Sequence, residues 1–334
     1  MGTSLAKAIF RLPNDTKIYL IEGEITDNQI AIDFNQSKKC FYISLFNNKD
    51  NAYCFFSEND SRLTIEDENF DLFKPTDIFE NCLSKDDYLT LVEKAKKQMQ
   101  HNEKFQKVVL ARCKTKNIST EINLRKIFDD MCIAYPNAFC YLLSSQITGT
   151  WIGASPELLL KKTESEIETV ALAGTLMNAE EKWNEKEMNE HRLVELFIED
   201  ILQKKHRAFS KKEAQTISSG NLKHLMSSYT IENINSINEL LSDLNPTPAT
   251  CGLEKNISLD FISENEKLER KFYSGFVGVT INSGTHLFAN LRCVQYLGNE
   301  IKLYAGAGIT KHSIAENEWH ETENKMEAIG QFFK

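Results

Sequence analysis

The segment Tyr304-Ala-Gly-Ala-Gly-Ile-Thr-Lys-His-Ser-Ile-Ala-Glu-Asn-Glu-Trp-His-Glu-Thr-Glu-Asn-Lys325 says more about the fold and the site than any other part of the chain. Its first residues predict an apolar strand that ends in a glycine-rich turn. Ser313, followed three residues later by Glu316, predicts the cap of a helix. The segment therefore predicts a strand, a turn and a helix in succession.

Three charged side chains of that helix share one face. Glu318, Glu321 and Lys325 are spaced by three and four residues, so they project from the same side. Two carboxylates and an ammonium beside a turn with free backbone N–H groups can hold a divalent cation and an anionic ligand together. The alternative is a solvated helix end with an incidental ion pair.

The composition is that of an ordinary globular protein. The chain has 334 residues, 41% hydrophobic and 26% charged, with a formal net charge of −9. We expect a single domain over residues 1–334, although the length also fits two. The negative charge argues against nucleic-acid and membrane partners held by bulk electrostatics. An anionic substrate would therefore need a local cluster of cations or a metal.

The compartment is expected to be the cytoplasm. No apolar run reaches the ~18 residues of a membrane span, and Lys7 and Arg11 interrupt the short apolar N-terminus. The eight cysteines include no Cys-x-x-Cys pair. Cys113, Cys140 and Cys293 lie in apolar strand-like segments, which is typical of reduced, buried thiols.

The pattern of elements predicts an α+β fold. Runs of strands joined by hairpin-like turns indicate antiparallel sheet rather than a doubly wound parallel one. Ser84, with Asp87 three residues on, predicts a helix cap. The predicted helices are 85–102, 184–204, 234–241, 257–267 and the C-terminal one, and the strands are 18–21, 40–45, 52–56, 107–113, 138–144, 151–161 with a break at 155–156, 167–173, 272–281, 286–296 and 300–305.

Two charged residues occupy positions where apolar ones are expected. Glu190, one turn after Glu187, shares a helical stripe with apolar residues that should face the core. A buried carboxylate needs a cation partner or a metal, unless it is simply exposed at a helix end. Arg292 interrupts an apolar strand, where its guanidinium should meet a carboxylate of the protein or of a substrate.

Lys107 and Glu157 are candidates for proton transfer. Lys107 opens the strand Lys-Val-Val-Leu-Ala-Arg112, and if it is buried it can act as a general base; otherwise it is an exposed lysine. Glu157 follows Pro156 between two apolar strands, a setting that raises the pKa of a carboxyl as a general acid requires. The alternative for Glu157 is an exposed turn.

These segments resemble the chorismate-utilising enzymes, the family of isochorismate, salicylate, anthranilate and aminodeoxychorismate synthases. Eight matches occur in order over about residues 100–330, too many for chance. Residues 1–100 carry little of the resemblance, and residues 1–80 are expected to be its more variable part. The matches are Lys107-Val-Val-Leu-Ala-Arg112, Gly153-Ala-Ser-Pro-Glu157, Leu172-Ala-Gly-Thr175, Asn189-Glu-His191, Pro246-Thr-Pro-Ala-Thr-Cys-Gly252, Glu269-Arg-Lys-Phe-Tyr-Ser-Gly275, Leu291-Arg292, and Leu303-Tyr-Ala-Gly-Ala-Gly-Ile309 through Glu318–Lys325.

The resemblance implies two packed antiparallel β-sheets surrounded by helices, with the active site in a cleft between the sheets. It also implies chorismate as substrate and Mg²⁺ as cofactor. Glu190 and Glu321 would hold the metal, with Glu187 and Glu318 close by. The substrate-binding groups would be Arg292 on the enolpyruvyl side, Tyr304, Gly306, Gly308, Lys325 and the segment Ala173, Gly174 and Thr175.

Three positions narrow the implied reaction. Family members that use water have a lysine where Lys107 stands, whereas those that install nitrogen have another residue. Ala173 stands where aminodeoxychorismate synthases have a nucleophilic lysine, and Pro246-Thr-Pro-Ala249 is of the isochorismate synthase type. The resemblance thus implies isochorismate synthase, in which Lys107 deprotonates water for addition at C2 and Glu157 protonates the departing C4 hydroxyl.

Other family activities remain alternatives. A salicylate synthase would continue to salicylate and pyruvate, and a catalytically silent member would serve as a binding subunit. Asn245 replaces a histidine that many isochorismate synthases have, which leaves side reactions open and leans toward menaquinone rather than siderophore supply. No glutamine amidotransferase subunit is expected, and we expect a monomer or a weak dimer.

Overall fold

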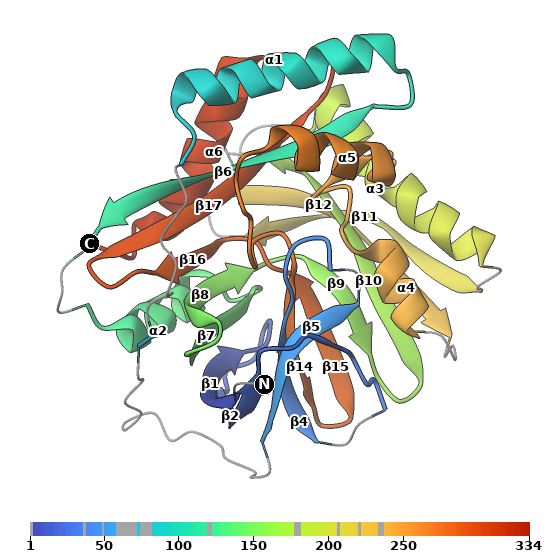
Figure 1. Ribbon diagram of the computed structural model, residues 1–334. Coiled ribbons are helices and arrows are strands. Elements are labelled where there is room, and N and C mark those ends of the chain that lie inside the picture. Colours follow the sequence, from blue (N-terminus) through green and yellow to red (C-terminus); the bar gives the residue numbers. More distant parts are fainter. Residues whose placement is uncertain are drawn as a thin grey trace.

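The computed structural model describes residues 3–35, 38–48, 50–57, 72–73, 82–118, 122–176, 182–205, 208–219, 222–232 and 237–334. Within them the chain forms two large sheets with helices on their outer faces (Figure 1). Every described ladder is antiparallel. The predicted α+β class with two packed antiparallel sheets is confirmed.

The eight-stranded sheet has the order β13-β6-β17-β16-β8-β7-β1-β2. Strands β6 and β17, second and third from one edge, pair along nearly their whole length, from Asn117 opposite Glu300 to Val108 opposite Ile309. The strands are β1 (Thr3–Arg11), β2 (Tyr19–Thr26), β6 (Lys107–Asn117), β7 (Phe139–Ser145), β8 (Gly149–Ser155), β13 (Gly252–Leu253), β16 (Cys293–Tyr296) and β17 (Glu300–Ile309).

The nine-stranded sheet has the order β11-β12-β10-β9-β15-β14-β4-β5-β3. One irregularity matters for function: the register of β10 against β12 shifts between Ala173 and Thr175. The strands are β3 (Ile30–Ala31), β4 (Lys39–Ile43), β5 (Asn51–Ser57), β9 (Leu158–Lys162), β10 (Glu166–Leu176), β11 (Phe209–Ser219), β12 (Leu222–Glu232), β14 (Phe276–Ile281) and β15 (Gly284–Ala289).

Aromatic side chains hold the two sheets together. Phe139 of one sheet stacks on Phe288 of the other with ring centroids 4.8 Å apart, and Phe10 meets Phe41 at 6.4 Å. All four are buried in one core cluster. Burial of such rings contributes the apolar area and the ring contacts that favour face-to-face packing.

In the described part of the chain, six helices cover this body (Figure 1). Helix α2 and the C-terminal α6 contribute to an apolar cluster with strands of the eight-stranded sheet, and α3 and α4 to one with the nine-stranded sheet. Helices α1 and α5 pack beside β6 and β17. Their bounds are α1 (Lys85–His101), α2 (Leu124–Ala134), α3 (Glu185–Lys204), α4 (Ile237–Leu244), α5 (Lys255–Asn265) and α6 (Ala315–Gly330).

Two local predictions for the C-terminal segment are wrong. The glycine-rich part is not a turn, because β17 continues to Ile309 as a partner of β6. Ser313 does not cap α6: its hydroxyl accepts a hydrogen bond from the Thr310 N–H at 3.1 Å, and α6 begins after Ile314 with no side-chain cap. By contrast, Ser84 does cap α1, accepting from the Asp87 N–H at 3.2 Å.

Other elements were missed or merged by the sequence pattern. Strand β1, helix α2 and the hairpin β11–β12 had no predicted counterpart. Strand β11 is rich in exposed polar residues, so it lacks a clear apolar period. The single strand predicted over 286–296 is two strands, β15 and β16, which belong to different sheets.

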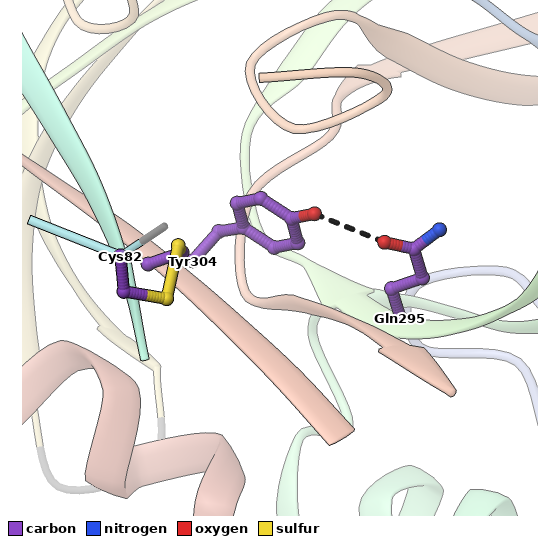
Figure 2. The surroundings of a disulfide bond; sticks show 4 residues. Cys82, Gln295 and Tyr304 are labelled. Atoms are coloured by element: carbon purple, nitrogen blue, oxygen red, sulfur yellow. Dashed lines mark hydrogen bonds between the residues drawn. A yellow bond between two sulfur atoms is a disulfide. The ribbon is translucent and has the colours of Figure 1, made fainter. Parts of the chain in front are cut away.

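A disulfide joins Cys82, just before α1, to Cys113 in β6 (Figure 2). The prediction of a reduced Cys113 is therefore wrong, because a pair separated by 31 residues leaves no sequence motif. Cys140 and Cys293 are buried free thiols, as predicted. Among the described residues, we find no helix with the length and apolarity needed to cross a bilayer.

Candidate active site

The eight-stranded sheet forks at Leu303, and the candidate site lies at the fork. Strand β16 pairs with β17 only through Ile301, Lys302 and Leu303, whereas β6 follows β17 to Ile309. A cavity of about 250 Å³ opens there, bounded by residues of both sheets and of α3 and α6. Except for Thr175 and Glu318, every site residue predicted from the sequence lines this cavity.

Glu157 and Arg292 reach the cavity from connections between the sheets. Glu157 lies between β8 of the eight-stranded sheet and β9 of the nine-stranded sheet, and Arg292 lies between β15 and β16. Such crossings leave the regular ladder, so their side chains can turn toward the space between the sheets. This explains why two polar residues interrupt otherwise apolar sequence.

Burial favours the protonated form of Glu157. Its side chain is 4% exposed, and burial raises the pKa of this carboxyl to about 7, against smaller opposing effects of a Thr247 hydrogen bond and the Lys107 charge. Oε1 of Glu157 accepts the hydrogen bond from Thr247 Oγ1 at 3.3 Å. A carboxyl that loses its proton near neutral pH suits a general acid, and the predicted environment of Glu157 is confirmed.

Lys107 is buried and ion-paired. Its side chain is 3% exposed and its Nζ lies 2.8 Å from Oε1 of Glu190. The predicted alternative of an exposed lysine is excluded. Gly308 makes room for this pair, since a Cβ at that position would lie 2.8 Å from Cε of Lys107 and 3.6 Å from Oε1 of Glu190.

Gly306 and Gly308 present backbone groups to the cavity. The carbonyl of Gly306 accepts a hydrogen bond from Lys325 Nζ at 3.0 Å. In an antiparallel strand the N–H and C=O of one residue point to the same side, and alternate residues share a side. Gly306 and Gly308 therefore face the edge that β16 leaves unpaired.

Arg292 lies beside a histidine that the sequence analysis did not select. Its Nη2 is 3.4 Å from Nε2 of His224, whose Nδ1 is 3.1 Å from the carbonyl oxygen of Gly174. Burial, followed by the Arg292 charge, lowers the pKa of His224 to about 4, so this ring is neutral. Arg292 itself has a positive φ of 50°, a strained conformation of the kind found at functional sites.

His224 could not be found from pattern alone. It lies in β12, within the polar hairpin that had no predicted strand. Its place in the cavity follows from the register of β12 against β10, which sets His224 opposite Thr175. The only signal in the sequence is a histidine that directly precedes the apolar pair Leu225-Met226.

The segment Ala173–Thr175 forms the irregular part of β10. Gly174 has φ of 76°, and a Cβ there would lie 3.2 Å from the carbonyl oxygen of Glu187 and 3.3 Å from its Cβ. Glycine thus lets the start of α3 approach the strand closely. Ala173 and Gly174 line the cavity; the side chain of Thr175 lies outside the described part of the structure.

Tyr304 lines the cavity, and a hydrogen bond and two aromatic contacts hold its side chain in place. Its hydroxyl donates a hydrogen bond to Oε1 of Gln295 at 3.1 Å (Figure 2), and its ring stacks on Trp151 and Tyr273 with centroid distances of 5.6 and 5.7 Å. Tyr304 also pairs with the disulfide-bonded Cys113 in the ladder between β17 and β6.

Carboxylates and a second lysine also line the cavity. Glu187, Glu190 and Glu321 all border the cavity, and Nζ of Lys325 lies 2.6 Å from Oε1 of Glu321. Burial opposes protonation of Lys325, but the Glu321 charge and hydrogen bond outweigh it and raise its pKa. Glu318 is buried and lines an adjoining, larger cavity that also borders Lys107, Glu190 and Glu321.

These residues suit a hard divalent cation. Oε2 of Glu187 is buried and has no hydrogen-bond partner among the described residues, and the donors nearby are carboxylate oxygens, which Mg²⁺ prefers. Glu190 and Glu321 are paired with lysines instead, and within the described ranges no three acidic, histidine or cysteine side chains converge as a preformed metal site. The donor chemistry fits Mg²⁺, but the carboxylates would have to turn toward it.

Comparisons with known proteins point to one family. The sequence profile of the family described as chorismate binding enzyme matches residues 29–334. Isochorismate synthase MenF of Escherichia coli K12 is 27% identical over 252 residues, 72% of this chain and 58% of that protein. The vibriobactin-specific isochorismate synthase of Vibrio cholerae is 28% identical over 249 residues, 69% and 62% of the two chains.

The fold is shared with a solved relative. The structure of the menaquinone-specific isochorismate synthase MenF from Escherichia coli covers 98% of this chain and 89% of its own, with a TM-score of 0.80 at 20% identity. This likeness shows the fold alone. The chain spans about three fifths of the length of the curated relatives it matches.

Proposed function

The chain belongs to the family of chorismate binding enzymes, and from that premise we propose that it is a Mg²⁺-dependent isochorismate synthase. The reaction adds water at C2 of chorismate and expels the C4 hydroxyl as water, so substrate and product are isomers. The observation that supports it most is that Lys107 and a protonated Glu157 border one cavity.

Lys107 would activate the nucleophile. In its neutral form its amine would take a proton from a water molecule as that water attacks C2. The contact with Glu190 and the space left by Gly308 hold the side chain in the cavity wall. A buried lysine whose position is fixed on two sides is suited to a directed proton transfer.

Glu157 would supply the proton for the leaving group. A carboxyl with a pKa of about 7 carries its proton at and below neutral pH and can donate it to the departing C4 hydroxyl. After the reaction Glu157 is ionised and Lys107 is protonated. Exchange of protons with solvent would return both residues to their starting forms.

The remaining cations would bind the carboxylates of the substrate. Arg292 and Lys325 both border the cavity, and the backbone at Gly306 and Gly308 faces the unpaired edge of β17. We assign Arg292 to the carboxylate on the enolpyruvyl side and Lys325 with this backbone to the remaining anionic groups. Charge-assisted hydrogen bonds of this kind orient a dianion and offset its desolvation.

Magnesium would be held by Glu190 and Glu321, with Glu187 and Glu318 close by. When bound, the cation would neutralise the ring carboxylate and withdraw charge from the conjugated system. Among these four carboxylates, Glu187 has a buried oxygen without a described hydrogen-bond partner, and a bound cation would satisfy it. Two of the similar proteins are named as menaquinone-specific and vibriobactin-specific isochorismate synthases, and we propose menaquinone or siderophore supply as the use of the product.

The test is to incubate the purified protein with chorismate and Mg²⁺ in ¹⁸O-labelled water and to separate the products by chromatography with mass detection. An isomer of chorismate that carries one heavy oxygen, and that disappears when the metal is chelated, would support the proposal. Metal-dependent salicylate and pyruvate would show a salicylate synthase instead. Unchanged chorismate would support a catalytically silent binding subunit.

A further inference from the structure

A buried polar cluster lies behind the cavity, between α3 and the strands β11 and β12. His191, Glu195 and Ser227 are 3%, 6% and 0% exposed, and none of the three lines the cavity. Polar groups this deeply buried are costly unless they are mutually satisfied. The proposed reaction gives them no role.

The cluster is a chain of hydrogen bonds. The Ser227 hydroxyl donates to Oε1 of Glu195 at 2.6 Å, and Nε2 of His191 lies 2.9 Å from the same hydroxyl oxygen. A hydroxyl has one proton to give, and Ser227 gives it to Glu195. His191 must therefore donate from Nε2, which fixes its tautomer.

Two cations fix the far end of the chain. Glu195 lies 2.8 Å from Nζ of Lys211 and 2.9 Å from Nη1 of Arg192. Burial would raise the pKa of Glu195, but the hydrogen bonds from Lys211, Ser227 and Arg192 lower it to about 2. Glu195 is thus ionised and can only accept, which makes the direction of the chain unambiguous.

The chain of hydrogen bonds starts beside the carboxylates proposed to bind the metal. His191 directly follows Glu190 on α3, and successive helical residues point about 100° apart, so Glu190 reaches Lys107 in the cavity while His191 points to the sheet. Nδ1 of His191 is buried and has no hydrogen-bond partner among the described residues, so Nε2 makes the contact that fixes the ring. One side chain therefore links the first turns of α3 to β12, a strand that borders the cavity.

We propose that His191 and Ser227, anchored by Glu195, are positioning residues that hold the start of α3 so that Glu187 and Glu190 face the metal. The inference rests on the proposed function, because it concerns the same Mg²⁺ ligands. It deepens that function by naming residues that touch neither substrate nor metal. Groups that orient metal ligands typically change metal affinity by about 10- to 100-fold when they are removed.

The test measures Mg²⁺ binding to the chorismate-free protein by titration calorimetry. Ser227→Ala removes both hydrogen bonds at the centre of the chain with little change in volume, and His191→Leu removes its start. We expect each to weaken Mg²⁺ binding by about 10-fold. His191→Gln, whose amide N–H can donate to Ser227 from nearly the same place, should bind Mg²⁺ within a few-fold of the wild type.

Glu199→Gln is the matched control. Glu199 lies on the same helix and contacts Lys211 at 3.0 Å, Arg192 at 3.3 Å and Tyr229 at 3.2 Å, but not His191 or Ser227 in any described contact. The Glu199→Gln substitution should lower the stability against urea without changing the Mg²⁺ affinity. If Ser227→Ala also lowers stability without changing the Mg²⁺ affinity, the hydrogen-bond chain is only structural and the positioning role is wrong.

The outcome separates this inference from the proposed function. Wild-type protein that binds no Mg²⁺ would overturn the metal assignment and the positioning role together. Wild-type binding with an unchanged affinity in Ser227→Ala and His191→Leu would overturn only the positioning role. The identity of the product is decided separately, by the isotope experiment.

Discussion

Glu157 and Arg292 are linked by two backbone hydrogen bonds: Glu157 bonds to the strand that precedes Arg292, and Arg292 bonds to the strand that precedes Glu157. The Glu157 carbonyl accepts from the Ala289 N–H at 3.0 Å, and the Arg292 carbonyl accepts from the Ala154 N–H at 3.1 Å. The crossing from β8 to β9 and the crossing from β15 to β16 thus run side by side. A proposed general acid and a proposed substrate-binding cation are fixed relative to each other by main chain alone, at the place where the two sheets exchange strands.

Glu157→Gln should nearly abolish turnover, with kcat lowered by about 10²- to 10⁴-fold, the usual contribution of a general acid. Glutamine keeps the size and a hydrogen bond to Thr247 but has no acidic proton. The measurement is steady-state isochorismate formation, with circular dichroism to verify the fold. Glu213→Gln, an exposed residue of β11, is the control, and a wild-type rate in Glu157→Gln would remove its assigned role.

The pKa of Glu157 also predicts a pH dependence of stability. The carboxyl ionises near 4.5 in an unfolded chain and at about 7 in the fold, so between these values the folded state holds a proton that the unfolded state has lost. Stability contributed by this group is therefore present below about pH 4.5 and is lost as pH rises to about 7. At about 1.36 kcal/mol per pH unit, the loss is about 3 kcal/mol.

Comparison with Glu157→Gln isolates this effect. The variant has no proton to lose, so its free energy of unfolding relative to the wild type should rise by about 3 kcal/mol between pH 4.5 and pH 8. Urea denaturation at the two ends of that range measures it. The wild-type kcat should fall with a basic limb near pH 7, and equal pH dependence of unfolding in both proteins would contradict the assignment.

Lys107→Ala should lower kcat by at least about 10²-fold, because it removes the proposed base while leaving the cavity open. Glu190 is partly exposed, so the loss of its partner should cost little stability. Turnover and urea denaturation are measured together. Lys104→Ala, at an exposed position three residues earlier, should behave as wild type; substantial turnover in Lys107→Ala would show that another group activates water.

Gly308→Ala should reduce activity through Lys107. The added methyl would lie 2.8 Å from Cε of Lys107, closer than side chains normally approach, so the lysine must move. We expect kcat to fall by about 10-fold or more, since small displacements of catalytic groups are costly. If displacement of Lys107 is the cause, the double variant with Lys107→Ala should be no less active than Lys107→Ala alone; an additive loss would indicate a direct effect on substrate binding.

Glu190→Gln should weaken the response to Mg²⁺, because it replaces an anionic ligand by a neutral one. We expect the Mg²⁺ concentration for half-maximal activity to rise by about 10-fold or more, in line with the loss of a ligand. The titration follows activity at saturating chorismate. The same substitution at Glu264, an exposed residue of α5, serves as control, and an unchanged Mg²⁺ titration in Glu190→Gln would refute the ligand role.

The parts of the fold that bear chemistry were predictable because their residues break local rules. A carboxyl after Pro156 and an arginine within an apolar strand each have few structural explanations. Their place between the two sheets explains both. The helices with strong apolar periodicity or a serine cap, such as α1, were predictable for ordinary reasons.

What the sequence did not reveal depends on long-range pairing. Strand β11 has few apolar residues, and β12 is placed by its pairing with β10, which brings His224 into the cavity. Ser313 and Glu316 match a capping motif, but the Ser313 hydroxyl bonds to Thr310 instead. The link from Cys82 to Cys113 depends on how α1 returns to β6, which no spacing encodes.

The fork in the eight-stranded sheet links ligand occupancy to resistance against unfolding. Beyond Leu303, β16 no longer pairs with β17, so the backbone of β17 on that side faces the cavity. Lys325 donates a hydrogen bond to the Gly306 carbonyl there. An anion bound there would accept hydrogen bonds from backbone N–H groups that β16 leaves unpaired. A ligand that binds only the folded state stabilises that state by about 2.7 kcal/mol when its concentration is one hundred times its dissociation constant. The empty protein should therefore be the form that proteases degrade first, so that cellular enzyme levels would follow substrate supply.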